Sequence, residues 1–317
     1  MEMRTLGRTA IPVSLVSLGA ASLADLYTAI SDEQAVATVH AALAAGITCI
    51  DTAPFYGSGL SERRLGLALR TVPRADYVLA TKVGRVITPQ GEAVFDMTRD
   101  GVLRSIDASL ARLGIDAIDI AHIHDPDDFE RAALDEVFPT LAELRAQGII
   151  RAISAGMNQW EMLDRFLAHA DFDAFMLAGR YTLLEHAASV AFLDRCAARG
   201  VGIMLAGVFN SGILATGACP GAKYNYADAP LVVLEQVRQI EAICARHQVG
   251  LATAALQFPL AHPAIDTLVL GMSTADTVTV NLSALAAPVP DACWQELRQA
   301  HLIAPDVPLP SSSPNHG

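Results

Sequence analysis

The sequence has few charged residues, and the basic ones are in the minority. Asp, Glu, Lys and Arg make up 18% of the 317 residues, below the roughly 25% that is usual for soluble domains. The 22 Lys and Arg residues face 34 Asp and Glu residues, which gives a formal net charge of −12. A molecule of this sign repels phosphate backbones and anionic lipid headgroups. We therefore expect no nucleic-acid partner and no membrane partner.

The sequence also lacks paired cysteines and a long apolar run. The five cysteines lie far apart with no Cys-x-x-Cys pair, and no apolar segment follows the first residues, so we expect no secretory leader and a reducing cytoplasm. The segment 200–222 is uncharged and long enough to cross a bilayer, but it contains six glycines, a proline and polar residues. That composition predicts a strand and loops.

Apolar residues are plentiful, at 52%, and their pattern predicts an α/β fold. Short apolar runs alternate with longer segments of helical period, which is typical of repeated βαβ units. The expected strands are 15–18, 48–51, 77–81, 118–123, 149–155, 174–177, 202–205 and 267–270. Eight units of about 35 residues use roughly 280 residues, as a closed (β/α)8 (TIM) barrel does.

Helix boundaries and terminal segments complete this prediction. Ser31 to Gln34 resembles a capping box before a helix that ends at Gly46. Three more helices are expected to end at glycines, over 99–113, 129–147 and 185–199. Segments 4–6 and 11–13 predict a hairpin across one barrel mouth, and an extra helix is expected near the carboxyl end. We expect one barrel domain over residues 1–307 and a flexible tail over 308–317.

Polar side chains follow three of the expected strands where each strand ends. Asp51 and Tyr56 follow the second strand, Lys82 ends the third and His124 ends the fourth. The carboxyl ends of barrel strands form the active-site face, so these four side chains are expected to meet there. A buried Lys82 beside Tyr56 favours phenolate and lowers the pKa of the phenol, while Asp51 orients Lys82. His124 is then placed to polarise an oxygen on a reacting carbon.

This set resembles the catalytic tetrad of the aldo-keto reductase family. The similarity includes the runs 46–53 and 118–124, the Tyr56-Gly57 pair and the Thr81-Lys82 pair. It implies a nicotinamide-dependent oxidoreductase in which Tyr56 exchanges the proton. The run 124–128 resembles a branch of dehydrogenases that act on aldoses or on pyridoxal. We expect oxidation of an aldose of the L-fucose, L-galactose or D-arabinose type at C1 to its lactone. A pyridoxal 4-dehydrogenase and a general aldehyde or ketone reductase are the alternatives.

The resemblance also implies a set of cofactor contacts. Asn158 is expected to bind the nicotinamide carboxamide, and Tyr181 to stack on the nicotinamide ring. The loop after the seventh strand is expected to wrap the pyrophosphate with backbone N–H groups. The expected contacts in the two last loops are Gly207, Phe209, Asn210, Ser211, Gly212, Gly271, Ser273, Asp276 and Asn281.

Charge predicts which nicotinamide cofactor is used. Segment 271–281, which follows the eighth strand, contains no basic residue to hold a 2′-phosphate. Asp276 would repel such a phosphate but can accept hydrogen bonds from ribose hydroxyls. We therefore expect NAD rather than NADP.

Two other classes of function remain possible from the residues alone. His122 and His124 point to the same side of one strand, and such a pair can bind a metal in a barrel hydrolase; we expect no metal, because Asp51 is the only further ligand at a strand end. A nucleotide-sensing barrel without catalysis is the other alternative. The sequence leaves the oligomeric state open.

Overall fold

A computed structural model describes residues 1–26 and 28–311, and it has a closed parallel barrel at its centre. All eight predicted strands are confirmed, each within three residues of its expected bounds. In the order of the chain they are β3 (Val16–Gly19), β4 (Cys49–Asp51), β5 (Val78–Val83), β8 (Ile118–His124), β9 (Ile150–Met157), β10 (Ala174–Ala178), β11 (Gly202–Ala206) and β14 (Ile265–Gly271). Each strand pairs with the next, and β14 pairs with β3 to close the barrel.

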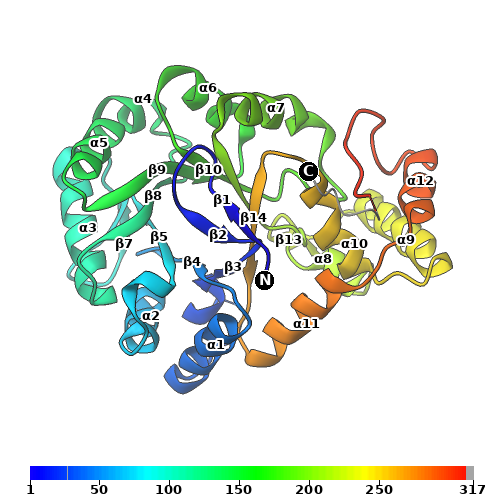
Figure 1. The fold of residues 1–317 in the computed structure, drawn as a ribbon, viewed down its shortest axis with the longest axis horizontal. Helices are drawn as coiled ribbons and strands as arrows, with labels where there is room; N and C mark the ends of the chain where they lie inside the picture. The colour runs from blue at the N-terminus through cyan, green and yellow to red at the C-terminus, as the bar shows by residue number, and fades with distance from the viewer. Residues whose placement is uncertain (27, 312–317) are drawn as a thin grey trace.

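Helices surround this barrel (Figure 1). They are α1 (Asp32–Ala44), α2 (Leu60–Leu69), α3 (Arg99–Leu113), α4 (Glu130–Ala132), α5 (Phe138–Ala146), α6 (Trp160–His169), α7 (Val190–Arg199), α8 (Ile213–Thr216), α9 (Leu231–Arg246), α10 (Leu251–Gln257), α11 (Ala275–Ala286) and α12 (Asp291–Gln299), with shorter turns η1 (Ala20–Ala24), η2 (Arg74–Asp76), η3 (Ala133–Val137), η4 (Ala187–Ser189) and η5 (Phe258–Ala261). The apolar faces of these helices and the outward faces of the strands form one large core. None of the helices within the described residues combines the length and apolar character that a membrane span requires.

The predicted hairpin is present and closes one end of the barrel. Strands β1 (Met3–Thr5) and β2 (Pro12–Ser14) are antiparallel, and Figure 1 shows them lying across the barrel opening. Leu6, Ile11 and Val13 bury their side chains among inward-facing residues at the start of the barrel strands. This end is therefore sealed, and the carboxyl ends of the strands form the open face.

Most helix boundaries agree with the predictions from the sequence, and three details differ. Helix α3 has the predicted bounds and ends at Gly114, and α1 ends before Gly46 as expected. Ser31 caps α1, but the side chain of Gln34 donates to the carbonyl oxygen of Ser273 instead of completing a capping box. The predicted helix 129–147 is divided by the π-helical turn η3. Helix α7 begins five residues later than predicted, after η4.

Two further hairpins and the end of the chain lie outside the barrel. Strands β6 (Arg85–Ile87) and β7 (Ala93–Phe95) pair after β5, and β12 (Lys223–Tyr224) pairs with β13 (Ala227–Asp228) after α8. The extra carboxyl-terminal helix is α12, which lies beside α9 (Figure 1). Of the tail predicted over 308–317, residues 312–317 lie outside the described residues, and Leu309 packs against the core.

Candidate active site

A cavity of about 500 Å³ opens at the carboxyl ends of the barrel strands, and three of the four predicted catalytic side chains line it. These are Tyr56, Lys82 and His124. Asp51 lies directly behind Lys82, at the end of β4. The structure thus brings together all four side chains of the predicted set.

Lys82 is the centre of this arrangement. Its Nζ atom donates to both carboxylate oxygens of Asp51 at 2.7 Å and to the carbonyl oxygen of Thr52 at 2.8 Å. Both side chains of the ion pair are almost fully buried. The same Nζ atom lies 4.8 Å from the centre of the Tyr56 ring. All three hydrogen bonds hold the ammonium group in one position next to the phenol.

The pKa of Tyr56 differs from the sequence-based prediction. Burial raises the pKa of this phenol above its usual value, while the Lys82 charge lowers it and the Asp51 charge raises it. Lys82 therefore acts in the predicted direction, but the expectation of a net lowering is wrong. The reason is that the free-energy cost of removing a phenolate from water exceeds the stabilisation that the Lys82 ammonium group gives, because the Asp51 charge opposes that stabilisation.

His124 is a neutral imidazole next to Tyr56. Burial, followed by the Lys82 and Arg85 charges, holds the pKa of His124 well below its usual value. The ring meets the Tyr56 ring edge-on, with centroids 5.9 Å apart. Nε2 lies 3.6 Å from Oδ2 of Asp125, and Nδ1 is buried with no hydrogen-bond partner in the described part of the chain. The nearby carboxylate favours the tautomer with hydrogen on Nε2, so His124 can donate a hydrogen bond toward the cavity.

His122 lies deeper in the barrel, where its Nδ1 and Ser154 Oγ form a hydrogen bond of 2.8 Å. Burial and Lys82 hold the pKa of His122 well below its usual value. Within the described residues, no group of three or more His, Cys, Asp and Glu side chains could hold a metal ion. The pair His122 and His124 therefore has no third ligand in this structure.

Several predicted cofactor residues lie at the same rim. Asn158 lines the cavity at the end of β9 and donates to the carbonyl oxygen of Ala178 at 2.9 Å. Gly207 lines it at the end of β11. Since β11 and β14 are neighbours in the barrel, the loops after these two strands lie side by side. Of the remaining predicted contacts, Phe209, Asn210, Ser211 and Gly212 lie in the loop after β11; Gly271 ends β14, Ser273 lies in the loop that follows, and Asp276 and Asn281 lie on α11.

The loop after β11 is a tight turn. Gly207, Asn210, Ser211 and Gly212 all have positive φ angles, and the N–H groups of Asn210 and Gly212 donate to the carbonyl oxygens of Gly207 and Phe209. No atom lies within 4 Å of where a Cβ atom would stand on Gly212, so the backbone is open to close approach. Asn210 is buried, and its Oδ1 has no hydrogen-bond partner among the described residues. These features fit a polar ligand such as a dinucleotide.

Two predicted residues have a different position from the one expected. Tyr181 is fully buried and does not line the cavity; its ring stacks on Phe258 at 5.6 Å and meets His262 edge-on. The structure does not bring Tyr181 to the cavity, and its stacking on a nicotinamide ring stays a prediction. The chain turns at Gly179, which has a φ of 70°, and this turn sends Tyr181 into the core while Ala178 stays at the cavity. Phe209 likewise packs against the core.

Other residues form the wall of the cavity beside the predicted catalytic and cofactor residues. Met157, Met176, Ala178 and Ala206 line the cavity at the ends of their strands. Leu26, Phe55 and Tyr226 line it from loops, as does Asp125, which follows His124. Place next to a strand end is the sequence signal of the first four, whereas Leu26 and Tyr226 lie in loops that the sequence offers as candidates for shaping the substrate pocket.

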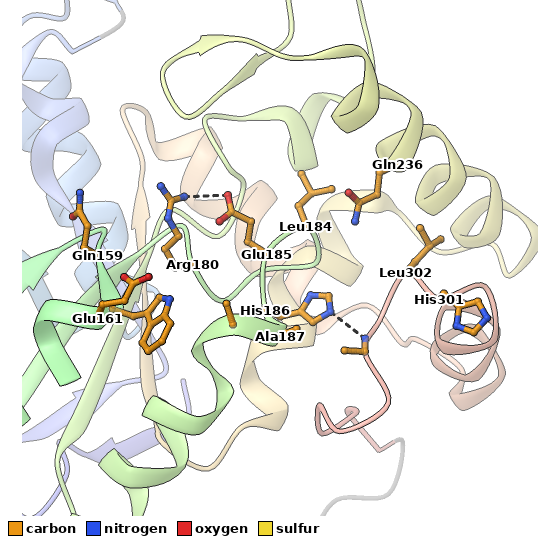
Figure 2. A pocket seen from close by; sticks show the side chains of 13 residues that line it. Gln159, Glu161, Arg180, Leu184, Glu185, His186, Ala187, Gln236, His301 and Leu302 are labelled. Carbon is orange, nitrogen blue, oxygen red and sulfur yellow. Dashed lines mark hydrogen bonds and ion pairs between the residues drawn. The ribbon is translucent and has the colours of Figure 1, made fainter. Parts of the chain in front are cut away.

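A second cavity has a volume of about 660 Å³, and Figure 2 shows side chains that line it. Gln159 and Arg180 line it, next in sequence to Asn158 and close to Ala178 in the first cavity. Arg180 forms an ion pair of 3.0 Å with Glu185. His186 accepts a hydrogen bond of 3.1 Å from the backbone N–H of Ala304, which fastens the carboxyl-terminal segment to this loop (Figure 2).

Comparison with known proteins agrees with this geometry. Residues 15–301 match the model of the aldo/keto reductase family. The chain is 39% identical to a D-threo-aldose 1-dehydrogenase of a Pseudomonas species, over 92% of this chain and 95% of that protein. It is 36% identical to a pyridoxal 4-dehydrogenase of Microbacterium luteolum, over 96% and 98%. An aldo-keto reductase from Bacillus halodurans, solved in its holo form, superimposes with a TM-score of 0.81 at 26% identity, covering 97% and 98% of the two chains.

The match covers nearly the whole barrel, and it includes the strand ends that bring Asp51, Tyr56, Lys82 and His124 together. The chain belongs to the aldo/keto reductase family, whose members are oxidoreductases that use nicotinamide cofactors.

Proposed function

We propose that this protein oxidises an aldose of the L-fucose, L-galactose or D-arabinose type at C1 and uses NAD. The observation that carries the proposal is the meeting of Tyr56, Lys82 and His124 in one cavity, with Asp51 bonded to Lys82. The similarity to a D-threo-aldose 1-dehydrogenase over most of both chains supports the choice of substrate. The product would be the aldonolactone.

The chain's own residues supply the proton transfer. Tyr56 as phenolate accepts the proton of the hydroxyl group on the anomeric carbon, and the Lys82 charge stabilises that phenolate. His124 donates a hydrogen bond from Nε2 to the same oxygen and holds it in place. A nicotinamide cofactor, when bound, accepts the hydride from that carbon. The O–H and C–H bonds break and a carbonyl double bond forms, which is the lactone.

Cofactor binding would use the rim residues that fit it. Asn158, with its amide at the cavity, is proposed to bind the carboxamide, and the open loop 207–212 the pyrophosphate. Gly271, Ser273, Asp276 and Asn281 stand at the end of β14 and along α11, where ribose and adenine are proposed to lie. Asp276 is exposed in the first turn of α11, and no basic residue occurs in 271–281. This charge supports NAD over NADP. All five cysteines are free thiols, which supports a reducing compartment such as the cytoplasm.

Pyridoxal is the second candidate substrate, because the chain is also similar to a pyridoxal 4-dehydrogenase. Pyridoxal exists partly as an internal hemiacetal, so the same proton and hydride transfers would give a lactone. A general aldehyde or ketone reductase would use the same four residues in the reverse direction.

The test is NADH formation, followed by absorbance, with L-fucose, L-galactose, D-arabinose and pyridoxal. Tyr56→Phe is expected to lower kcat by about 10²- to 10⁴-fold, the usual share of a general base. Tyr77→Phe is the matched control, because Tyr77 precedes β5 at the sealed end of the barrel and does not line the cavity. Near-normal turnover by Tyr56→Phe would remove Tyr56 from the proposed role, and absence of turnover with every sugar would reject the aldose.

A further inference from the structure

Asp125 occupies an unusual backbone position at the edge of the candidate active site. It follows His124 directly and has a φ of 42°, in the left-handed region that few residues other than glycine adopt. Its N–H donates to the carbonyl oxygen of Gly156 at 3.0 Å, which fixes this conformation. Among the described residues that line the cavity, Asp125 is the only acidic one. Strained backbone at such a place is a reason to look for a functional role.

Arg85 holds the Asp125 side chain from outside the cavity. Its Nη2 atom donates to Oδ2 of Asp125 at 2.7 Å. The guanidinium group itself lies between two aromatic rings, 4.4 Å from the centre of Phe55 and 4.6 Å from that of Phe95. Strand pairing between β6 and β7 sets Arg85 opposite Phe95. The carboxylate is therefore fixed in one orientation by a group that does not enter the cavity.

The fixed carboxylate can still accept hydrogen bonds. An ionised carboxyl group has about four acceptor positions, and the bond from Arg85 is the only one that Asp125 receives from the described residues on its side chain. The side chain is 34% exposed. A hydroxyl group of a bound molecule can therefore reach it.

Distance defines which hydroxyl group that is. Oδ2 of Asp125 lies 3.6 Å from Nε2 of His124, the atom proposed to donate to the oxygen on the reacting carbon. Two hydroxyl oxygens on neighbouring carbons are about one hydrogen-bond length apart. A vicinal diol can thus place one oxygen at the His124 donor and the second at the Asp125 acceptor.

We propose that Asp125, fixed by Arg85, accepts a hydrogen bond from the hydroxyl group next to the reacting carbon and so selects aldoses that carry a 2-hydroxyl group. The inference rests on the proposed function, and it names the feature of the substrate that the site recognises. It also favours sugars over pyridoxal. Pyridoxal has no hydroxyl group on a carbon bonded to the reacting carbon, and its phenolic oxygen is largely deprotonated at neutral pH, so that oxygen would meet Asp125 as a second anion.

Two sugars that differ by one oxygen atom test this contact. D-arabinose has a 2-hydroxyl group, and 2-deoxy-D-ribose is the same molecule without it. We expect the wild-type protein with NAD to show a kcat/KM about ten- to hundredfold higher for D-arabinose, the range of one hydrogen bond to a charged group. In Asp125→Gly, which suits the positive φ, this ratio is expected to fall to within about threefold of one.

Two further variants distinguish loss of the hydrogen bond to Asp125 from a general loss of activity. Asp125→Asn keeps the shape and tolerates the backbone conformation but loses the charge, so its ratio should lie between those of wild type and Asp125→Gly. Asp128→Asn removes the same charge from an exposed side chain that does not line the cavity, and it should keep the wild-type ratio.

The outcomes distinguish this inference from the proposed function. Turnover of both sugars by wild type, with a ratio that Asp125→Gly leaves unchanged, would overturn the role of Asp125 and leave the dehydrogenase intact. Oxidation of pyridoxal but of neither sugar would also overturn it, with Tyr56 chemistry still supported. No NADH from any of these three compounds, nor from L-fucose or L-galactose, would reject the proposed function and this inference together.

Discussion

The ion pair of Lys82 and Asp51 shows how one residue depends on another in this site. Burial disfavours the charge on each side chain, and each partner's charge opposes that effect on the other. Lys82 remains protonated because Asp51 is ionised, and its charge then acts on Tyr56. A change at either residue is therefore expected to reach the phenol.

Lys82→Met is expected to lower the free energy of unfolding by about 3–5 kcal/mol, because it leaves a buried carboxylate without its counter-charge. The double variant Asp51→Asn/Lys82→Met should recover part of this loss. Urea unfolding of the three proteins measures both effects. Equal stability of wild type and Lys82→Met would show that Asp51 needs no partner.

Lys82→Met is also expected to change the pH dependence of the substrate oxidation that the variant still performs. Without Lys82 the pKa of Tyr56 rises further, so the phenolate that accepts the proton forms only at higher pH. The pH of half-maximal kcat should therefore move upward in Lys82→Met. Measuring kcat from pH 6 to 11 tests this, and an unchanged midpoint would separate Lys82 from the ionisation of Tyr56.

At the scale of elements, the hairpin of β1 and β2 is attached to the barrel by close backbone contact. Gly7 has a φ of 48°, and a Cβ atom there would stand 2.4 Å from the Gly202 nitrogen and 2.5 Å from the Gly200 oxygen. Gly7→Ala is expected to cost more than the roughly 1–2 kcal/mol of a left-handed alanine, since the hairpin must move. Gly91→Ala is the control, with a φ of 85° and open space around it. Equal decreases in melting temperature for the two variants would show that the steric contact at Gly7 does not contribute to stability.

The loop before α7 holds the carboxyl-terminal segment through His186 (Figure 2). The Ala304 N–H donates to Nε2, and Nδ1 bonds to the Thr182 carbonyl oxygen, so the folded protein holds the neutral ring. Burial lowers the pKa of His186 below 6.5. The unfolded chain thus binds more protons, and stability is lost as the pH falls below about 6.5, by at most about 1.4 kcal/mol per pH unit for this group.

We therefore expect His186→Gln to have a shallower loss of stability than wild type between pH 6.5 and pH 5. Urea unfolding at several pH values measures the slope. His122 and His124 contribute to the slope in both proteins, because their pKa values are lowered too. His169→Gln, at an exposed position, is expected to keep the wild-type slope, and an equal change in this control would contradict the role of His186.

The elements themselves could be predicted from the sequence better than the details at their ends. The barrel strands are buried apolar runs, and several of the helices between them end at a glycine. The order of the strands, and the place of the four catalytic candidates at their carboxyl ends, could therefore be predicted from the sequence. The position of Tyr181 could not, because a left-handed turn at Gly179 decides which side chain faces the cavity. The contact of Arg85 with Asp125 was also out of reach, since it joins a hairpin to a strand end 40 residues away.

At the scale of the whole molecule, the two ends of the barrel differ in structure and in proposed function. The hairpin seals one end (Figure 1). The other end carries the cavity and the loops proposed to bind the cofactor. The net charge of −12 disfavours additional phosphate groups in general. Cofactor choice nevertheless depends on where charge lies, because salt screens exposed charges beyond about 10 Å.

Asp276 is the residue that we propose to decide between the two cofactors. We expect wild type to prefer NAD to NADP by at least about tenfold in kcat/KM, since a 2′-phosphate near Asp276 would find a like charge and no basic side chain in 271–281. Asp276→Arg replaces repulsion with a phosphate ligand and should lower this preference or reverse it. Asp116→Arg changes the net charge equally, from an exposed residue before β8 at the sealed end of the barrel. If both variants shifted the preference equally, overall charge would select the cofactor. A shift confined to Asp276→Arg would assign that selection to the first turn of α11. A wild-type preference for NADP would contradict the charge argument altogether.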